Sequence, residues 1–186
     1  MASHSLRNVK ERRPRRCPGR GDTLDARHAL IALSLLLACS SPLGQEERTN
    51  VFEDPFLRVT QRLVACPVPE GPLYTQAEAR AQSHLRAEKG TTCYYWGRCR
   101  LPNAYLYDKE IIPRVAIFIQ RDQRFDESSI WILGQRRWVY LKGCVANEAQ
   151  SRELEAEVRL IDDVEAVINE LMVGTSGKPP YDVQRR

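Results

Sequence analysis

The sequence has few of the residue types that build catalytic and metal sites. Only one of its three histidines, His84, lies beyond residue 28, and no motif supports a Ser-His-Asp or thiol-histidine nucleophile. Glycine-rich phosphate loops are absent, and the cysteines do not form the paired C-x2-C knuckles of zinc sites. We therefore expect no enzyme activity, no catalytic residues, no cofactor and no metal site.

Long hydrophobic runs are also missing. The longest, Ala29–Ala38 (ALIALSLLLA), would reach only about 15 Å as a helix, which is half of a bilayer's hydrocarbon thickness. A short apolar run behind basic residues is typical of a signal peptide, so we expect residues 1–38 to be a leader and signal peptide. Because the basic part is unusually long, translation starting near Arg27 is an alternative, and the precursor would then lack Cys17.

The residues that end this run carry a resemblance. Leu36-Leu37-Ala38-Cys39 resembles the lipobox of bacterial lipoproteins, which implies that Cys39 receives diacylglycerol and becomes the new N-terminus. Ser40 follows where an aspartate would favour the inner membrane. The expected location is therefore periplasmic, lipid-anchored, at the inner leaflet of the outer membrane. The alternative is an ordinary signal peptide cleaved near Ala38 or after Gly44, with Cys39 incidental.

The charge excess of the chain is concentrated in its leader. The chain has 28 Lys and Arg against 24 Asp and Glu; residues 1–38 hold 8 and 3 of these, which leaves 20 and 21 for residues 39–186. Without the leader the protein is nearly neutral. We therefore expect no nucleic-acid partner, since binding the phosphate backbone calls for a basic surface.

Four cysteines remain behind the anchor, an even number that predicts two disulfides in an oxidising compartment. Three pairings are possible. We expect a local bridge between Cys93 and Cys99 and a long-range bridge between Cys66 and Cys144. The competing interpretation is a zinc site formed by the four thiols with His84.

The chain from residue 39 divides into four expected parts. Residues 39–65 are polar and predict a tether, and residues 66–104 form a cysteine-containing extension with a helix over 76–89. Thr75 and Glu78 make a capping box for that helix, and Gly90 is expected at its C-terminal cap. Residues 105–174 form the main domain, and 175–186 a flexible tail.

Aromatic residues are concentrated between Cys93 and Tyr107. They either pack the disulfide loop onto the domain or form a binding surface, because Trp, Tyr and Arg are enriched in interface hot spots. The residues that would contact a partner are Trp96, Arg98, Arg100 and Tyr105.

Residues 105–174 give an αββαβ pattern. A helix is expected from an N-cap at Asp108 to Arg121, although Pro113 could move its start to Ile112. Strands at 129–133 and 138–141 follow, joined by the hairpin Gly134–Arg137. Asn147 opens a second helix, and the last strand covers 164–173. The expected fold class is an α+β sandwich, a three-stranded sheet with two helices on one face.

This pattern resembles the BON domain, a module of bacterial periplasmic and outer-membrane proteins that include an osmotically induced one. The resemblance rests on Trp138–Val145 (WVYLKGCV), Asn147–Glu157 and Val164–Val173 (VEAVINELMV). Two family glycines are missing. Asp163 stands before the last strand, where its side chain tolerates a left-handed backbone, and Arg136-Arg137 in the hairpin implies a different turn.

The resemblance implies binding to phospholipid surfaces or attachment of envelope components to the membrane, in support of envelope integrity. Ile117 is expected to point away from the buried face of its helix, and with Arg114 and Arg121 it could contact lipid headgroups. Alternatively, the aromatic loop covers that face. A second function, from another class, is a structural or protein-interaction subunit of an outer-membrane complex without lipid recognition.

Overall fold

The computed structural model describes residues 46–184. The expected leader, signal peptide and Cys39 anchor lie outside these residues. None of the described helices combines the length and the apolar character needed to cross a membrane. The elements in chain order are β1 (Phe56–Arg58), α2 (Gln76–Tyr95), η2 (Ala104–Tyr107), α3 (Asp108–Arg121), η3 (Gln123–Phe125), β2 (Ser129–Gln135), β3 (Trp138–Val145), α4 (Glu148–Val158) and β4 (Ala166–Val173).

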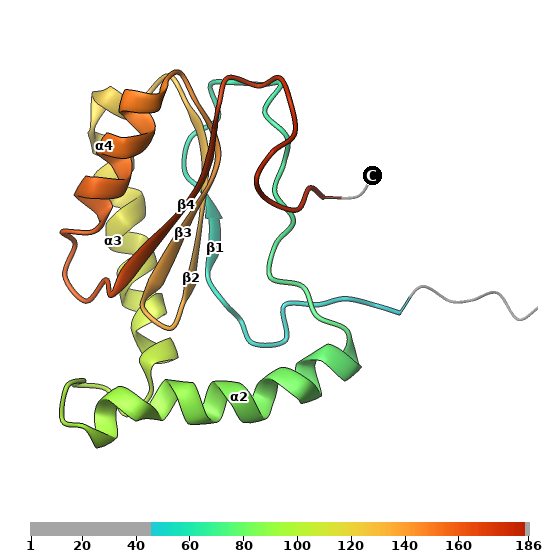
Figure 1. The fold of residues 1–186 in the computed structure, drawn as a ribbon, viewed down its shortest axis with the longest axis vertical. Coiled ribbons are helices and arrows are strands. Elements are labelled where there is room, and N and C mark those ends of the chain that lie inside the picture. The colour runs from blue at the N-terminus through green and yellow to red at the C-terminus, as the bar shows by residue number, and fades with distance from the viewer. Residues whose placement is uncertain (1–45, 185–186) are drawn as a thin grey trace, which may run out of the picture. The chain divides into compact units, whose positions relative to one another are not determined.

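The sheet has four strands in the order β1-β2-β3-β4, with β3 and β4 parallel and the other pairs antiparallel. Helices α3 and α4 lie on the same face of the sheet (Figure 1). The main core between these layers is mostly aliphatic, with the buried rings of Tyr107 and Phe125 added, and its fully buried members include Ile111, Ile119, Ile132, Leu141 and Leu154. The α+β class and the two helices of the αββαβ unit are as expected, but the prediction of three strands was wrong.

The fourth strand comes from the segment expected to be a tether. Phe56–Arg58 pairs with residues 131–133 of β2, and the chain then stays on β2: the N–H of Val59 donates to the carbonyl of Ile130, and that of Arg62 to the carbonyl of Ser128, both at 2.8 Å. Three residues of strand give too little alternation for a sequence signal. Residues 46–65 are therefore part of the folded body rather than a tether.

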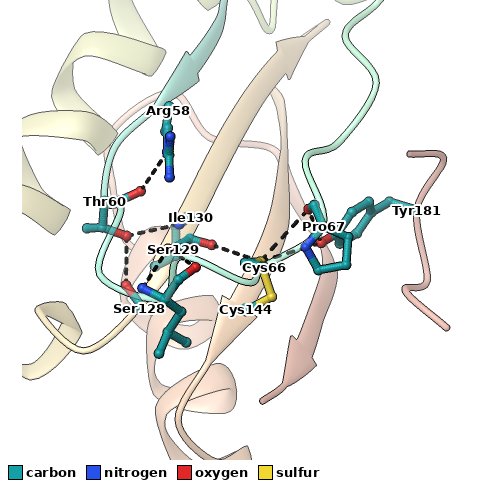
Figure 2. Close-up of a disulfide and its surroundings, with 10 residues drawn as sticks. Arg58, Thr60, Cys66, Pro67, Ser128, Ser129, Ile130, Cys144 and Tyr181 are labelled. Atoms are coloured by element: carbon teal, nitrogen blue, oxygen red, sulfur yellow. Dashed lines mark hydrogen bonds between the residues drawn. A yellow bond between two sulfur atoms is a disulfide. The ribbon is translucent and has the colours of Figure 1, made fainter. Parts of the chain in front are cut away.

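A second, smaller core covers the other face of the sheet. Cys66 in the loop after β1 is joined to Cys144 of β3 by a disulfide, and Trp131 and Met172 pack beside it. Figure 2 shows this bridge between the loop and the sheet. Both faces being covered, β2 is buried along nearly its whole length. The two pairings, Cys66–Cys144 and Cys93–Cys99, are those expected from the sequence, and they occupy all four thiols of the alternative zinc site.

The described C-terminal residues also pack on this face, instead of forming the flexible tail that was expected. The Tyr181 hydroxyl donates to the carbonyl of Pro67 at 2.8 Å, beside the disulfide (Figure 2). The N–H of Glu70 donates to the carbonyl of Asp182 at 2.7 Å, and the N–H of Gln184 to that of Val68 at 2.9 Å. Residues 175–184 thus close the second core.

Helix α2 begins as predicted and ends later. The capping box is present, with the Glu78 N–H donating to the Thr75 hydroxyl and the Thr75 N–H to the Glu78 carboxylate. The helix continues through Gly90, which was expected to end it. A Cβ on Gly90 would lie only 2.4 Å from Asn103, so this glycine allows close packing of the helix on the following loop and is not a cap.

The turn between β2 and β3 consists of Arg136 and Arg137 alone, since Gln135 pairs with Trp138. Both arginines have positive φ, 59° and 66°, as a two-residue type I′ hairpin requires. Asp163 also has positive φ, 70°, in place of the family glycine. The hairpin is therefore tighter than the four-residue connection expected from the sequence.

Asp108 is not the N-cap of α3. The capping position is Tyr107, which makes no side-chain cap bond, and the helix begins at Asp108 with Pro113 inside it. The Asp108 carboxylate instead accepts the backbone N–H groups of Arg136 and Arg137, each at 2.7 Å. The carboxylate thereby holds the hairpin turn onto the start of α3.

Candidate functional site

The outer face of α3 carries one large apolar side chain. Ile117 is 47% exposed, whereas Ile111, Ile112, Val115 and Ile119 on the same helix are fully buried. The aromatic loop after α2 does not cover Ile117, which was the alternative. Arg114 and Arg121, one turn before and one turn after, stand on the same face because helix positions three or four apart are neighbours. The structure therefore brings together the three residues predicted for membrane contact.

These residues line an open groove where α3 ends and η3 turns back. The full lining is Arg114, Ile117, Phe118, Arg121, Asp122, Gln123 and Arg124. Phe118 contributes the second apolar wall, and its ring packs against the buried ring of Phe125 with 6.1 Å between centroids. The groove thus combines an apolar floor with three arginines and a single carboxylate.

The three arginines of the groove differ in what they already bind. A nitrogen of the Arg114 guanidinium lies 3.1 Å from Asp163. Arg124 pairs with Asp122, Glu153 and Glu157, which ties η3 to α4. Arg121 is exposed and makes no ion pair within residues 46–184. It is therefore the arginine most available to an added anion.

The Asp122–Arg124 pair also fixes the charge state at the groove's end. Hydrogen bonds from the Arg124 guanidinium hold the pKa of Asp122 below its usual range, and the bond to Asp122 raises the pKa of Arg124. Both groups stay ionised near neutral pH. The lining side chains alone carry a formal charge of +2, but Asp163, Glu153 and Glu157 pair with Arg114 and Arg124 and offset it.

Sequence reasoning missed Phe118 and Arg124 as groove residues. Phe118 falls within the buried arc of α3 and was assigned to the core, although its ring is only partly covered. Arg124 lies beyond the expected end of the helix. The signal that could have revealed the turn is Asp122, whose side chain accepts the N–H of Arg124 at 3.0 Å and caps η3.

The other predicted contact set does not form one surface. Trp96 and Arg98 are exposed at the end of α2. Arg100 donates to Glu110 at 2.7 Å, and Tyr105 lies half-buried with its ring 4.0 Å from the Arg86 guanidinium. Only Trp96 and Arg98 therefore remain free for a partner.

Arg86 belongs to a buried polar cluster that joins α2 to the N-terminal segment. It donates through two nitrogens to Asp54, whose carboxylate also accepts from Gln135 at 2.6 Å. The Arg86 guanidinium lies between the rings of Phe52 and Tyr105, about 4 Å from each. Burial raises the pKa of Asp54, against the hydrogen bond from Gln135 and the charge of Arg86, which lower it. The cluster's own groups satisfy one another, so its role is structural.

Within residues 46–184 no group of three or more His, Cys, Asp and Glu side chains could hold a metal ion. His84 is exposed on α2 beside Glu88. The groove on α3 is therefore the strongest candidate for a binding site.

Comparison with protein families identifies the part of the chain that carries this groove. Residues 107–175 match the BON domain. This BON domain runs from the end of η2 to the residues after β4, close to the expected 105–174, and it includes α3 and the groove. The family is associated with phospholipid binding and envelope proteins. No match to the chain is found among curated proteins or solved structures.

Proposed function

We propose that this chain is an envelope lipoprotein, anchored through Cys39, whose BON domain binds anionic phospholipid surfaces through the groove on α3. The observation that carries the proposal is the exposed Ile117 between Arg114 and Arg121, within the matched domain. An apolar side chain flanked by arginines suits the boundary between headgroups and acyl chains.

The expected affinity of the groove is modest. A basic residue near an anionic surface contributes about 1 kcal/mol, and Arg121 is the one without an ion pair in the described chain. A lipid anchor compensates for this weakness, because a tethered site meets the membrane at a high effective concentration. The groove would then orient the domain rather than provide the attachment.

Two further features support an envelope location. Both disulfides, Cys66–Cys144 and Cys93–Cys99, suit an oxidising compartment. The apolar run and Cys39 in the sequence resemble a lipoprotein signal, with Ser40 favouring the outer membrane. In this setting the BON domain would attach the membrane to other envelope components or support the membrane directly.

Vesicle co-sedimentation of residues 46–186 tests the groove. This segment is one compact unit that holds both cores and both disulfides, so it retains the contacts described above, and it lacks the apolar leader that would itself bind lipid. We expect binding to vesicles of phosphatidylglycerol and phosphatidylethanolamine, weakened about fivefold by Arg121→Gln, which corresponds to about 1 kcal/mol. Ile117→Ser should weaken it as well.

The matched controls are Arg152→Gln and Leu160→Ser, which remove an exposed arginine and an exposed leucine elsewhere on the domain. If residues 46–186 bind neither anionic nor phosphatidylcholine vesicles, direct lipid recognition is excluded. If Arg121→Gln and Arg152→Gln weaken vesicle binding equally, the interaction is a non-specific attraction between charges.

The anchor is tested separately in cells that express the full chain. Labelled palmitate should be incorporated into the protein and should be absent from the Cys39→Ser variant. Labelling that persists in Cys39→Ser would refute attachment at this residue and leave the groove as an independent question.

A further inference from the structure

Three consecutive aromatic side chains project from the end of α2. Tyr95 is 82% exposed and Trp96 is 73% exposed, and Tyr94 beside them is about half exposed. The two tyrosine rings contact each other edge to face, with centroids 6.5 Å apart. Large aromatic side chains gathered at one exposed point usually mark an interaction site. We call Tyr94–Trp96 the aromatic tip.

The tip is preformed. The disulfide Cys93–Cys99 closes the loop around it, and backbone bonds from Gly97 N–H to Tyr94 and from Arg98 N–H to Cys93, both 2.9 Å, fix the turn. Gly97 has a φ of 66°, which favours glycine. A preformed loop loses little conformational entropy on binding, so the exposure of the aromatic rings is built into the fold.

The base of the tip is fixed to the domain core. Cys99 and Leu101 pack against the main core, and the Leu101 N–H donates to the buried Tyr107 hydroxyl at 2.9 Å. The Arg137 guanidinium lies 3.3 Å from the Cys99 sulfur. The base of the aromatic tip is therefore fixed to the main core by packing and hydrogen bonds.

The charge around the tip identifies the occupant. No Asp or Glu occurs between Glu88 and Asp108. Arg100 is neutralised by Glu110, but Lys89 and Arg98 make no ion pair in the described part of the chain. A Tyr-Tyr-Trp cluster with unpaired cations complements the anionic membrane interface, where Trp and Tyr sit at headgroup level and Lys and Arg meet the surface charge.

We propose that the aromatic tip inserts into the headgroup region of an anionic bilayer, as a membrane contact separate from the groove on α3. The tip precedes the BON domain match at 107–175. The inference extends the proposed membrane role to a second surface and does not depend on Arg121 or Ile117.

The fluorescence of Trp96 can report whether the aromatic tip enters the membrane. Of the three tryptophans, Trp131 is buried in the second core and Trp138 is partly covered, so Trp96 is the only largely exposed one. With residues 46–186 and phosphatidylglycerol–phosphatidylethanolamine vesicles, its emission should shift to shorter wavelength. Phospholipids brominated near the headgroup should quench it. Trp96→Phe should remove both signals, which assigns them to the tip.

Tyr95→Ser should weaken vesicle binding on the order of tenfold, and Leu160→Ser, which changes an exposed apolar residue within the BON domain match, should not. Both variants should keep the circular dichroism and unfolding midpoint of the parent. The proposal is overturned if the protein binds vesicles while the emission of Trp96 is neither shifted nor quenched. It is also overturned if the aromatic tip binds a protein and not lipid.

The same assay separates the two surfaces. Trp96 quenching that survives Arg121→Gln supports the tip even if the groove has no role. Binding that depends on Arg121 while Trp96 stays unquenched supports the groove and refutes the tip.

Discussion

The carboxylate of Asp108 accepts the backbone N–H of Arg137 at 2.7 Å, across 29 residues of sequence. Its other oxygen accepts the N–H of Arg136 at the same distance. A glycine-free hairpin turn is thus held by a carboxylate at the start of the helix that carries the groove. Two energetic costs therefore occur together, the burial of the Asp108 carboxyl group and the left-handed backbone of the hairpin turn. Each gives a prediction.

Asp108 should make stability depend on pH. Burial raises the pKa of its carboxyl to about 7, against the hydrogen bonds from Arg137 and Arg136, which lower it. Between about pH 4 and pH 7 the folded protein therefore holds a proton that the unfolded chain has lost. The stability linked to this proton is fully present below the unfolded pKa and is lost as pH rises towards 7.

Urea titrations of the parent and of Asp108→Asn between pH 4 and pH 7 measure this effect. The free energy of unfolding of the parent should fall relative to that of the variant, on the order of 2 kcal/mol over the range. Exposed Asp126 provides the control Asp126→Asn. Parallel profiles for parent and Asp108→Asn would show that the carboxylate keeps an ordinary pKa.

A glycine in place of Arg136 should favour the backbone conformation of the hairpin turn. Arg136 has a φ of 59°, a conformation that costs a residue with a Cβ about 1–2 kcal/mol. Arg136→Ala and Arg136→Gly both remove the contact with the Trp138 ring, so their difference isolates the backbone. We expect the glycine variant to be more stable than the alanine variant by about 1 kcal/mol in chemical denaturation. Equal stabilities would mean that the turn has another conformation.

Arg86 should be important for the attachment of α2. Its side chain is largely buried beside Asp54, and Arg86→Ala would leave that carboxylate buried without its charge partner, at a cost of about 3–5 kcal/mol. Arg80→Ala, on the exposed side of the same helix, should cost little. Adding Asp54→Asn to Arg86→Ala should recover part of the loss, and a double variant with simply additive losses would contradict the pairing.

The two disulfides should contribute differently to the free energy of unfolding. They span 78 and 6 residues, and the chain-entropy relation gives about 4.5 and about 2.2 kcal/mol. Replacing both cysteines of a pair by alanine should therefore destabilise the protein more for Cys66–Cys144 than for Cys93–Cys99, as thermal unfolding can show. The reverse order would indicate strain in the long-range bridge.

The αββαβ unit could be predicted because its signals are local. The buried arc of α3, the strand residues of β2 and β3, and the Asn147 cap are each set by neighbours within a few positions. The Asn147 side chain accepts the Gln150 N–H at 2.9 Å, as the capping rule states. Local rules failed at Asp108 because a distant turn competes for its oxygens.

The second face of the sheet could not be predicted. Residues 56–70 and 175–184 owe their order to β2, β3 and each other, through contacts such as Tyr181 with Pro67 across 114 residues. Part of the groove was missed for a similar reason. Arg124 returns to it through η3, a turn of three residues too short for a periodic pattern.

The disulfide between Cys66 and Cys144 has a mechanical consequence. Tension applied at the N-terminal side of the body would first break the contacts of Thr49 with Tyr74 and of Asp54 with Arg86. It would then peel β1, a three-residue edge strand, away from β2. Unravelling would then stop at Cys66, where the covalent bond transfers the load to β3 within the sheet. At most about 70 Å of chain, from residue 46 to residue 66, could be drawn out this way. Beyond that extension, a protein held by its N-terminal side could unfold further only if the sheet itself broke.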